Sequence, residues 1–178
     1  MTIRATAAIV ASAALAGLVA SGPAAALGGK ATAELKDRDG KAVGTVQIME
    51  TAAGSLVKVV VKGLTPGPHG LHVHETGKCD GDFMSAGEIY NPLGSKHGFL
   101  SDEGPMAGDL PNLHVGAGGE LEVEFINQFV TLSKDGEETM FDADGAALVV
   151  FEKGDDYLTD GDGNSGTRIA CGALVSGK

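Results

Sequence analysis

The chain has no tryptophan, only two tyrosines and six phenylalanines among its 178 residues, so any core is mainly aliphatic. Cationic residues are also scarce: 13 lysines and arginines stand against 24 aspartates and glutamates, which gives a formal charge of -11. This surplus of negative charge argues against nucleic acid, and against an anionic membrane surface, as a partner. The length suits one domain with a core of its own. The 28 glycines predict many turns.

Charges are almost absent from the N-terminal segment, where Arg4 is the only one before Lys30. An apolar run covers Ala5 to Val19, and three consecutive alanines at 24–26 then offer a small-x-small cleavage site. The run is too short for a membrane span, so it predicts a secretory signal peptide over 1–26. The mature domain, 27–178, is then expected to be periplasmic or secreted, with no membrane span.

Cysteine is limited to Cys79 and Cys171, and neither lies in a C-x-x-C motif that would indicate metal ligands. The oxidising surroundings of an exported protein favour a disulfide between them. Such a bridge would close a loop of about 90 residues, worth up to about 4–5 kcal/mol in the chain-entropy model. Two free buried thiols are the alternative.

Short alternating segments bounded by turn residues recur along the mature chain, with no convincing amphipathic helix. The expected strands are 31–36, 43–50, 56–62, 71–74, 120–125, 146–152 and 169–175. Strands of this length and spacing predict an antiparallel sandwich or a closed barrel. More than forty residues before Glu120 show little regular pattern, which is typical of a functional loop, and a second irregular stretch runs from Gly154 to Arg168.

Histidine is also scarce, but two of the five histidines, His72 and His74, form an H-x-H pair near the start of a predicted strand. Alternate side chains of a strand share one face, so both imidazoles point the same way. Two imidazoles on one face can hold a borderline or soft metal ion. An H-x-H pair alone is a weak signal, so the meaning of this one depends on the rest of the chain.

Five motifs follow one another in order along the mature chain. They are GLHVHE at 70–75, AGEIYNP at 86–92, KHG at 96–98, AGDLPNL at 107–113 and GNSGTRIACG at 163–172. Together, and in their spacing, they resemble the secreted bacterial copper–zinc superoxide dismutases over essentially the whole mature chain. The resemblance implies superoxide dismutase activity and a disulfide between Cys79 and Cys171. It also implies a Greek-key β-barrel of about eight antiparallel strands with two long functional loops.

The family holds copper with the two histidines of the H-x-H pair, a histidine that bridges to zinc, and a histidine late in the chain. His72 and His74 occupy the first two positions. The bridging position falls on Ile89 and the late position on Phe151. The resemblance therefore implies copper at His72 and His74, with two of its four protein ligands replaced by apolar side chains.

Zinc in the family takes the bridging histidine, two further histidines and an aspartate. These positions hold Ile89, His97, Met106 and Asp109, so that His97 and Asp109 form a residual zinc site. Glu88 is close enough in sequence to be considered as a substitute ligand, although it neighbours the bridging position rather than replacing it. We expect a structural, hydrogen-bonding role for His97 and Asp109 in preference to tight zinc binding.

Two further residues match positions around the family's metals. Arg168 matches the arginine that guides the anion to copper, a role that applies only if the protein is an active enzyme. Its alternative role is to bond carbonyls of the long loop. Asp155 matches an aspartate that hydrogen-bonds ligand histidines of both sites, and it can still orient His72 and His97.

Copper chemistry separates the remaining functions. Cu(II) prefers several nitrogen or oxygen ligands, whereas Cu(I) tolerates few ligands and accepts a thioether. Met106 is one candidate thioether, although it equally fits a gap-filling role in the core.

We expect a copper-binding envelope protein for storage or delivery, with low copper occupancy, an empty zinc half and little or no dismutase activity. An active dismutase with a rebuilt site and a metal-free structural or interaction module are the alternatives. A homodimer and a copper-handling partner protein are both compatible with the sequence.

Overall fold

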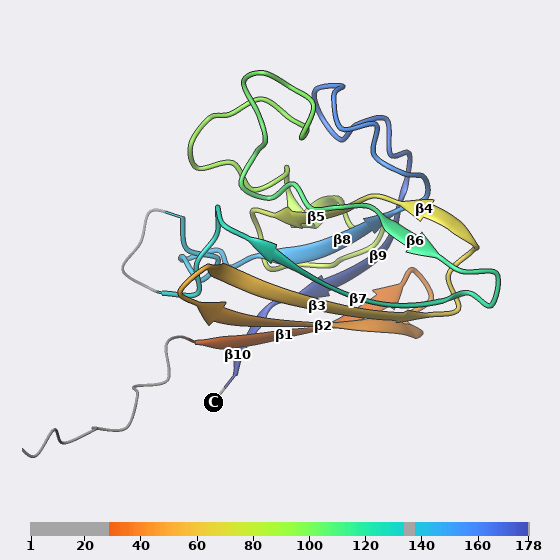
Figure 1. The fold of residues 1–178 in the computed structure, drawn as a ribbon. Helices are drawn as coiled ribbons and strands as arrows, with labels where there is room; N and C mark the ends of the chain where they lie inside the picture. Colours follow the sequence, from red (N-terminus) through yellow and green to blue (C-terminus); the bar gives the residue numbers. More distant parts are fainter. Residues whose placement is uncertain (1–28, 134–137, 178) are drawn as a thin grey trace, which may run out of the picture.

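The described part of the chain folds into β-strands joined by turns and long loops (Figure 1). The computed structural model describes residues 29–133 and 138–177, so the predicted signal peptide at 1–26 lies outside the described residues. The strands are β1 Lys30–Asp37, β2 Ala42–Thr51, β3 Gly54–Lys62, β4 Gly67–His69, β5 Leu71–His74, β6 Leu113–Val115, β7 Glu120–Asn127, β8 Ala147–Phe151, β9 Arg168–Ala173 and β10 Val175–Gly177. A short 3-10 turn, η1, spans Met84–Ala86. Within the described ranges, no helix is both long and apolar enough to cross a membrane.

Eight strands form one antiparallel sheet in the order β5-β8-β9-β1-β2-β3-β7, with β10 paired to β1. β4 and β6 form a separate two-stranded sheet. Because β1 pairs with both β2 and β9, the N-terminal strands and the C-terminal strands belong to one curled sheet (Figure 1). The prediction of an all-β fold with about eight antiparallel strands is confirmed.

Alternation of side chains along the strands builds the core. In β1 as far as Leu35 and in β3 as far as Val61, exposed or half-buried residues alternate with buried ones, and this pattern places Leu35 and Val59 fully inside. β7 alternates as expected, with Val123 packed against the core and its glutamates outside. On that outer face, Lys58 of β3 pairs with Glu122 and lies within reach of Glu124. The period-2 alternation therefore separates a core face from a solvent face in these strands.

Two strand boundaries differ from what the local sequence indicates. Pro66-Gly67-Pro68 favours a turn, but the last three residues of 66–69 form β4, in which Pro68 lies opposite His114 of β6. A proline fits this edge position because a short, two-stranded sheet leaves one side of the strand without a ladder partner. The expected strand 169–175 is divided at Leu174 into β9, which pairs with β8 and β1, and β10, which pairs with β1 alone.

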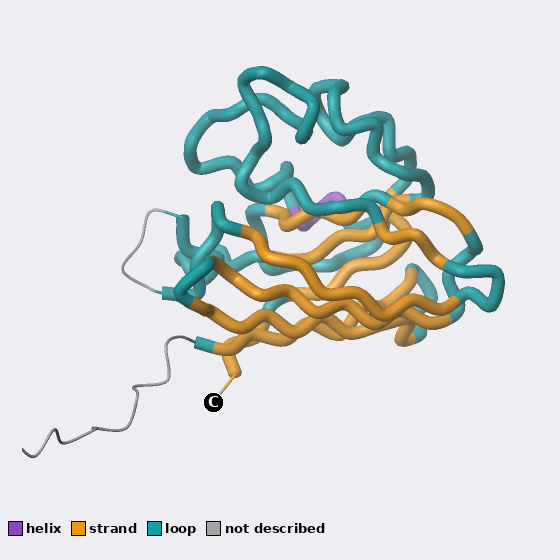
Figure 2. Tube along the Cα trace, viewed as in Figure 1, coloured by secondary structure: helices purple, strands orange, loops and turns teal. Residues whose placement is uncertain are grey.

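Two long loops lie on the same side of the sheet (Figure 2). One connects β5 to β6 through residues 75–112, and the other connects β8 to β9 through residues 152–167. All residues of β5 and β8 are buried, which is expected of strands that are covered on both faces. The two long loops predicted from the sequence are therefore present, and they cover the strand that carries the H-x-H pair.

A disulfide anchors the first loop to β9. Cys79 and Cys171 are joined with their Cα atoms 5.7 Å apart, across a sequence separation of 92. Cys171 is buried in a small apolar cluster that also contains Phe83 and Phe151. The bridge therefore attaches the start of the loop next to the strand end that holds Phe151.

Removal of this disulfide is expected to lower the free energy of unfolding by about 2–4 kcal/mol, because the unfolded chain regains conformational freedom. Urea unfolding of the oxidised wild type and of the Cys79→Ala/Cys171→Ala variant measures the difference. Wild type unfolded in the presence of a reductant controls for the loss of the two side chains. Equal free energies of unfolding in all three samples would contradict the expectation.

Candidate metal centre

β5 places His72 and His74 inside the molecule, where both side chains are buried. Two short segments of the first long loop pair with this strand, so that Asp109 lies opposite His72 and Ile89 lies opposite His74. Residues directly opposite each other in an antiparallel pair carry their side chains on the same side, with Cβ atoms about 4.5–5.5 Å apart. The pairing therefore brings residues from three parts of the sequence together around β5.

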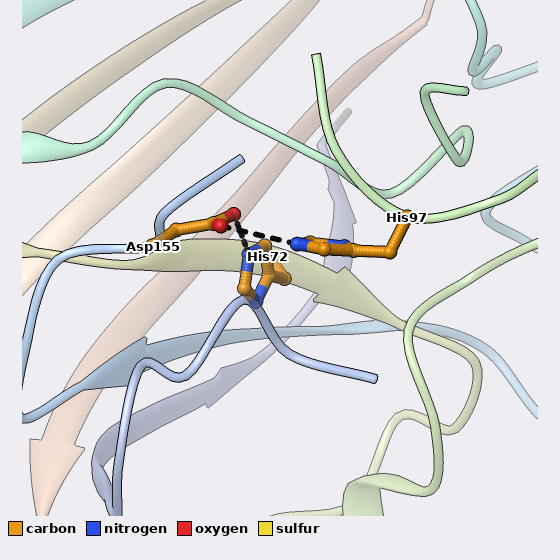
Figure 3. A group of neighbouring side chains, drawn as sticks. All are labelled: His72, His97 and Asp155. Carbon is orange, nitrogen blue, oxygen red and sulfur yellow. Dashed lines mark hydrogen bonds and ion pairs between the residues drawn. The ribbon is translucent and has the colours of Figure 1, made fainter. Parts of the chain in front are cut away.

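Asp155 joins two of the predicted metal residues through its carboxylate (Figure 3). Its Oδ2 lies 2.9 Å from Nε2 of His72, and its Oδ1 lies 3.1 Å from Nε2 of His97. Because a carboxylate accepts hydrogen bonds, both imidazoles donate from Nε2, and the lone pair of a neutral His72 ring is on Nδ1. This Nδ1 is buried and has no hydrogen-bond partner among the described residues.

His74 presents a second unpartnered nitrogen. Its Nδ1 lies 3.0 Å from the carbonyl oxygen of Gly87, and since a carbonyl accepts, Nδ1 carries the proton and Nε2 the lone pair. Burial, and next the positive charge of Arg168, lower the pKa of His74 to about 3, so the ring is neutral at physiological pH. Its Nε2 is buried and finds no hydrogen-bond partner in 29–133 or 138–177.

His97 and Asp109 form a close pair beside β5. Nδ1 of His97 lies 2.8 Å from Oδ1 of Asp109, and because their alignment falls outside hydrogen-bond geometry, the contact is an ion pair. The other oxygen of Asp109 accepts from the backbone N–H groups of Gly98 and Met106. Burial lowers the pKa of His97, but the contacts with Asp109 and Asp155 outweigh it and raise that pKa to about 10. At neutral pH, His97 is a cation between two carboxylates and holds the loop in place.

His72, His97 and Asp155 are the one group of three potential ligand residues whose ligand atoms converge, within 4.8 Å, in the part of the chain that the structure describes. Nε2 of each imidazole already bonds to the carboxylate. A carboxylate in this position orients imidazole rings and sets which nitrogen is left free for a metal. In this trio the Asp155 carboxylate therefore orients the two imidazole rings.

Two residues without a predicted role position Asp155, Asn112 by hydrogen bonds and Gly163 by leaving room for the carboxylate. The Asn112 amide donates to the Asp155 carbonyl at 2.9 Å, and its oxygen accepts from the Asp155 N–H at 2.8 Å. Gly163 has a φ of 63°, and a Cβ there would lie 1.7 Å from Oδ1 of Asp155 and 2.9 Å from Nε2 of His97. Asn112 lies in the motif at 107–113 and Gly163 in the motif at 163–172. A sequence motif does not show which atoms its residues contact.

Apolar side chains occupy the two positions where the resemblance implies further imidazoles. The buried ring of Phe151 lies 5.1 Å from the ring of His72 and 5.9 Å from that of His74, measured between centroids. It stacks on His74 at an interplanar angle of 24°. Ile89 is buried opposite His74. Neither side chain has a lone pair to offer a metal. His72 and His74 are therefore the two imidazoles of β5 without a further ligand from these two positions.

Met106 does not line the pocket that His74 lines. It lines a pocket of about 700 Å³ that Ile89 and Glu88 also line, and this lining includes no histidine. The carboxylates of that pocket are Glu75, Glu88, Asp142 and Asp144. This placement does not support Met106 as a thioether ligand for copper on β5, nor Glu88 as a zinc ligand beside His97.

Arg168 bonds the first long loop. Its guanidinium donates to the carbonyl oxygens of Phe83 at 2.9 Å and Gly87 at 2.8 Å, which is the loop-bonding role that the sequence left open. The guanidinium carbon also lies 6.0 Å from the centre of the Phe151 ring, a distance at which a cation is attracted to an aromatic face. Arg168, Phe151 and His74 line one pocket of about 490 Å³.

Comparisons with known proteins agree with this fold and with the motifs. A family model for copper/zinc superoxide dismutase (SODC) matches residues 42–174. The Cu-Zn superoxide dismutase 2 of Aquifex aeolicus is 44% identical over 147 residues, which covers 82% of this chain and 86% of that protein. The superoxide dismutase-like protein YojM of Bacillus subtilis is 44% identical over 145 residues, covering 80% of this chain and 74% of that protein.

Solved structures of SOD-like proteins have a similar fold. A crystal structure of a SOD-like protein from Bacillus subtilis has a TM-score of 0.79 at 43% identity and covers 81% of this chain and 97% of that chain. A double mutant of a SOD-like protein from the same organism, with histidine introduced at two positions, has a TM-score of 0.79 at 44% identity. It covers 81% of this chain and 96% of its own. The present chain therefore belongs to the copper/zinc superoxide dismutase family.

Proposed function

We propose that this protein binds copper through His72 and His74 and stores or delivers the metal outside the cytoplasm, with little or no dismutase activity. One observation carries the proposal: Nδ1 of His72 and Nε2 of His74 are both buried and unpartnered among the described residues. Each ring is fixed by a hydrogen bond at its other nitrogen. An unsatisfied buried polar atom costs about 1–3 kcal/mol, and a metal ion that accepts its lone pair removes that cost.

The donor set fits Cu(I) better than Cu(II). Cu(I) accepts a small number of nitrogen or sulfur ligands, whereas Cu(II) prefers a tetragonal set of several nitrogen or oxygen ligands. Ile89 and Phe151 add no donor atom next to His74, and the Phe151 ring stacks on it. Bound copper supplies one-electron chemistry between Cu(II) and Cu(I). The apolar side chains of Ile89 and Phe151 favour the Cu(I) state.

The zinc half is proposed to stay empty. A zinc site in a protein normally has three or four protein ligands, with nitrogen, sulfur or carboxylate oxygen donors. His97 and Asp109 provide two, while Ile89 lies opposite His74 and Met106 lines another pocket. In our proposal His97 and Asp109 stabilise the loop through their ion pair instead.

Two observations bear on the setting of this function and on its alternative. The Cys79–Cys171 disulfide fits an extracytoplasmic protein, because thiols in the cytosol are kept reduced. The Phe151 ring packs close to both His72 and His74, which favours a metal-free structural or interaction module as the second candidate. Metal analysis separates the two candidates.

Metal loading of the purified mature protein is expected to give about one copper per chain and no zinc, because the two free imidazole nitrogens on β5 suit copper. The dismutase rate is expected to be far below the diffusional ceiling of about 10⁸–10⁹ M⁻¹s⁻¹. Elemental analysis and a superoxide assay after removal of excess metal measure both. The Cu-Zn superoxide dismutase 2 of Aquifex aeolicus, loaded in parallel, is the positive control. Stoichiometric zinc with a rate near the ceiling would contradict the proposal, and a protein that retains no metal would support the structural module.

A further inference from the structure

Met84 is the methionine that shares a pocket with a histidine of β5. It lines the same pocket of about 490 Å³ as His74, Phe151 and Arg168. Its side chain is 57% exposed, in contrast to the buried His74 at 1%. Because Met84 is largely exposed, its thioether is accessible to an ion that approaches from solvent.

The turn that carries Met84 is held in a defined position. Phe83, immediately before η1, has a left-handed backbone with a φ of 69°, and its side chain is buried. Arg168 donates to the carbonyl of Phe83 and to that of Gly87, so it holds both ends of the turn. The carbonyl of Gly87 also accepts from His74 Nδ1. One backbone oxygen therefore links the orientation of the His74 ring to the segment that carries Met84.

The charges that line the pocket suit a cation. The carboxylates of Asp82, Glu88 and Asp162 face it, together with the guanidinium groups of Arg38 and Arg168. The guanidinium groups keep their charge, although they donate to backbone carbonyls: Arg38 to that of Arg168, and Arg168 to the two loop carbonyls. Three carboxylates against two guanidinium groups leave one net negative charge on the lining, which favours a metal cation over an anion.

We propose that Met84 is a thioether ligand for Cu(I) in this pocket and acts together with His74. The assignment deepens the proposed copper binding and rests on it. A thioether is a soft donor that Cu(I) accepts and that suits neither Zn²⁺ nor Cu(II) as well, so Met84 makes the pocket selective for Cu(I). The ligand that the pocket takes is then the reduced copper ion.

X-ray absorption of the copper(I)-loaded mature protein tests the assignment. Wild type is expected to show sulfur as well as nitrogen around copper, and Met84→Leu is expected to show nitrogen alone. We expect Met84→Leu to weaken Cu(I) binding at least about tenfold in a chelator competition, because loss of even a group that only supports metal ligands costs about 10–100-fold in affinity. Met106→Leu, in the neighbouring pocket, and Met49→Leu, on β2, are matched controls that keep the sulfur signal.

The outcomes distinguish this assignment from the proposed function. Copper that is bound by nitrogen alone in the wild type, or a sulfur signal that disappears in Met106→Leu instead, would overturn the role of Met84 and leave copper binding intact. A wild type that binds no Cu(I) would overturn both. Because Met84 is exposed, Met84→Leu is expected to keep the thermal unfolding midpoint of the wild type, which excludes misfolding as the cause of a lost signal.

Discussion

Replacement of both apolar side chains by histidine, Ile89→His/Phe151→His, is expected to raise the dismutase rate of this protein by several orders of magnitude. The rate is expected to stay below the diffusional ceiling of about 10⁸–10⁹ M⁻¹s⁻¹. The position of Ile89 is directly opposite His74, and the ring of Phe151 lies close to the rings of both His72 and His74. Imidazoles at these positions would give four nitrogen donors, the kind of set that Cu(II) prefers. Dismutation needs copper to alternate between its two oxidation states, so a site that holds Cu(II) is a precondition.

The Ile89→His/Phe151→His variant is compared with wild type by a superoxide assay and by electron paramagnetic resonance of bound Cu(II). Ile89→Gln/Phe151→Gln is the matched control, because it also replaces the two apolar side chains with polar ones but offers poor copper ligands. A Cu(II) spectrum and activity are expected in the histidine variant alone. Equal rates in the two variants would show that the apolar side chains only block access, and would contradict the ligand argument.

The strands were the most predictable part of this molecule. Alternation over Glu120 to Phe125 and over 56–62 places one face against the core, and this is a property of the strand itself. β4 was not predicted, because Pro66-Gly67-Pro68 reads as a turn and the pairing with β6 depends on residues more than forty positions away. A short strand that exists through its distant partner leaves little local pattern to detect.

The candidate site was predictable as a set of residues, but not as a set of atoms. The sequence indicates that His72, His74, His97 and Asp155 belong together. Only the fold determines that Asp155 binds Nε2 of two rings and that His74 bonds to a loop carbonyl. These contacts decide which nitrogens are left free, and they depend on how the two long loops fold over β5.

The methionines illustrate the same limit. The resemblance draws attention to Met106, because it stands where the family has a zinc ligand. Position in a motif says nothing about exposure or about which pocket a side chain lines, and Met106 lies in a pocket without a histidine of β5. Met84 matches no ligand position, yet it shares a pocket with His74.

Titration with Cu(I) in the presence of a competing chelator tests the copper-binding claim most directly. Each of the variants His72→Ala and His74→Ala removes one of the two free imidazole nitrogens. The expected loss of affinity is more than about a hundredfold, since even groups that merely support metal ligands change affinity by about 10–100-fold. The double variant is expected to retain no Cu(I) against the chelator.

His114→Ala is the matched control for this titration, because His114 is an exposed histidine on β6. It is expected to bind Cu(I) as tightly as the wild type. Urea unfolding of each variant establishes that the protein remains folded under the conditions of the titration. The account predicts measurable Cu(I) binding in wild type and His114→Ala and its loss in the three β5 variants, and equal affinity in all five proteins would contradict it.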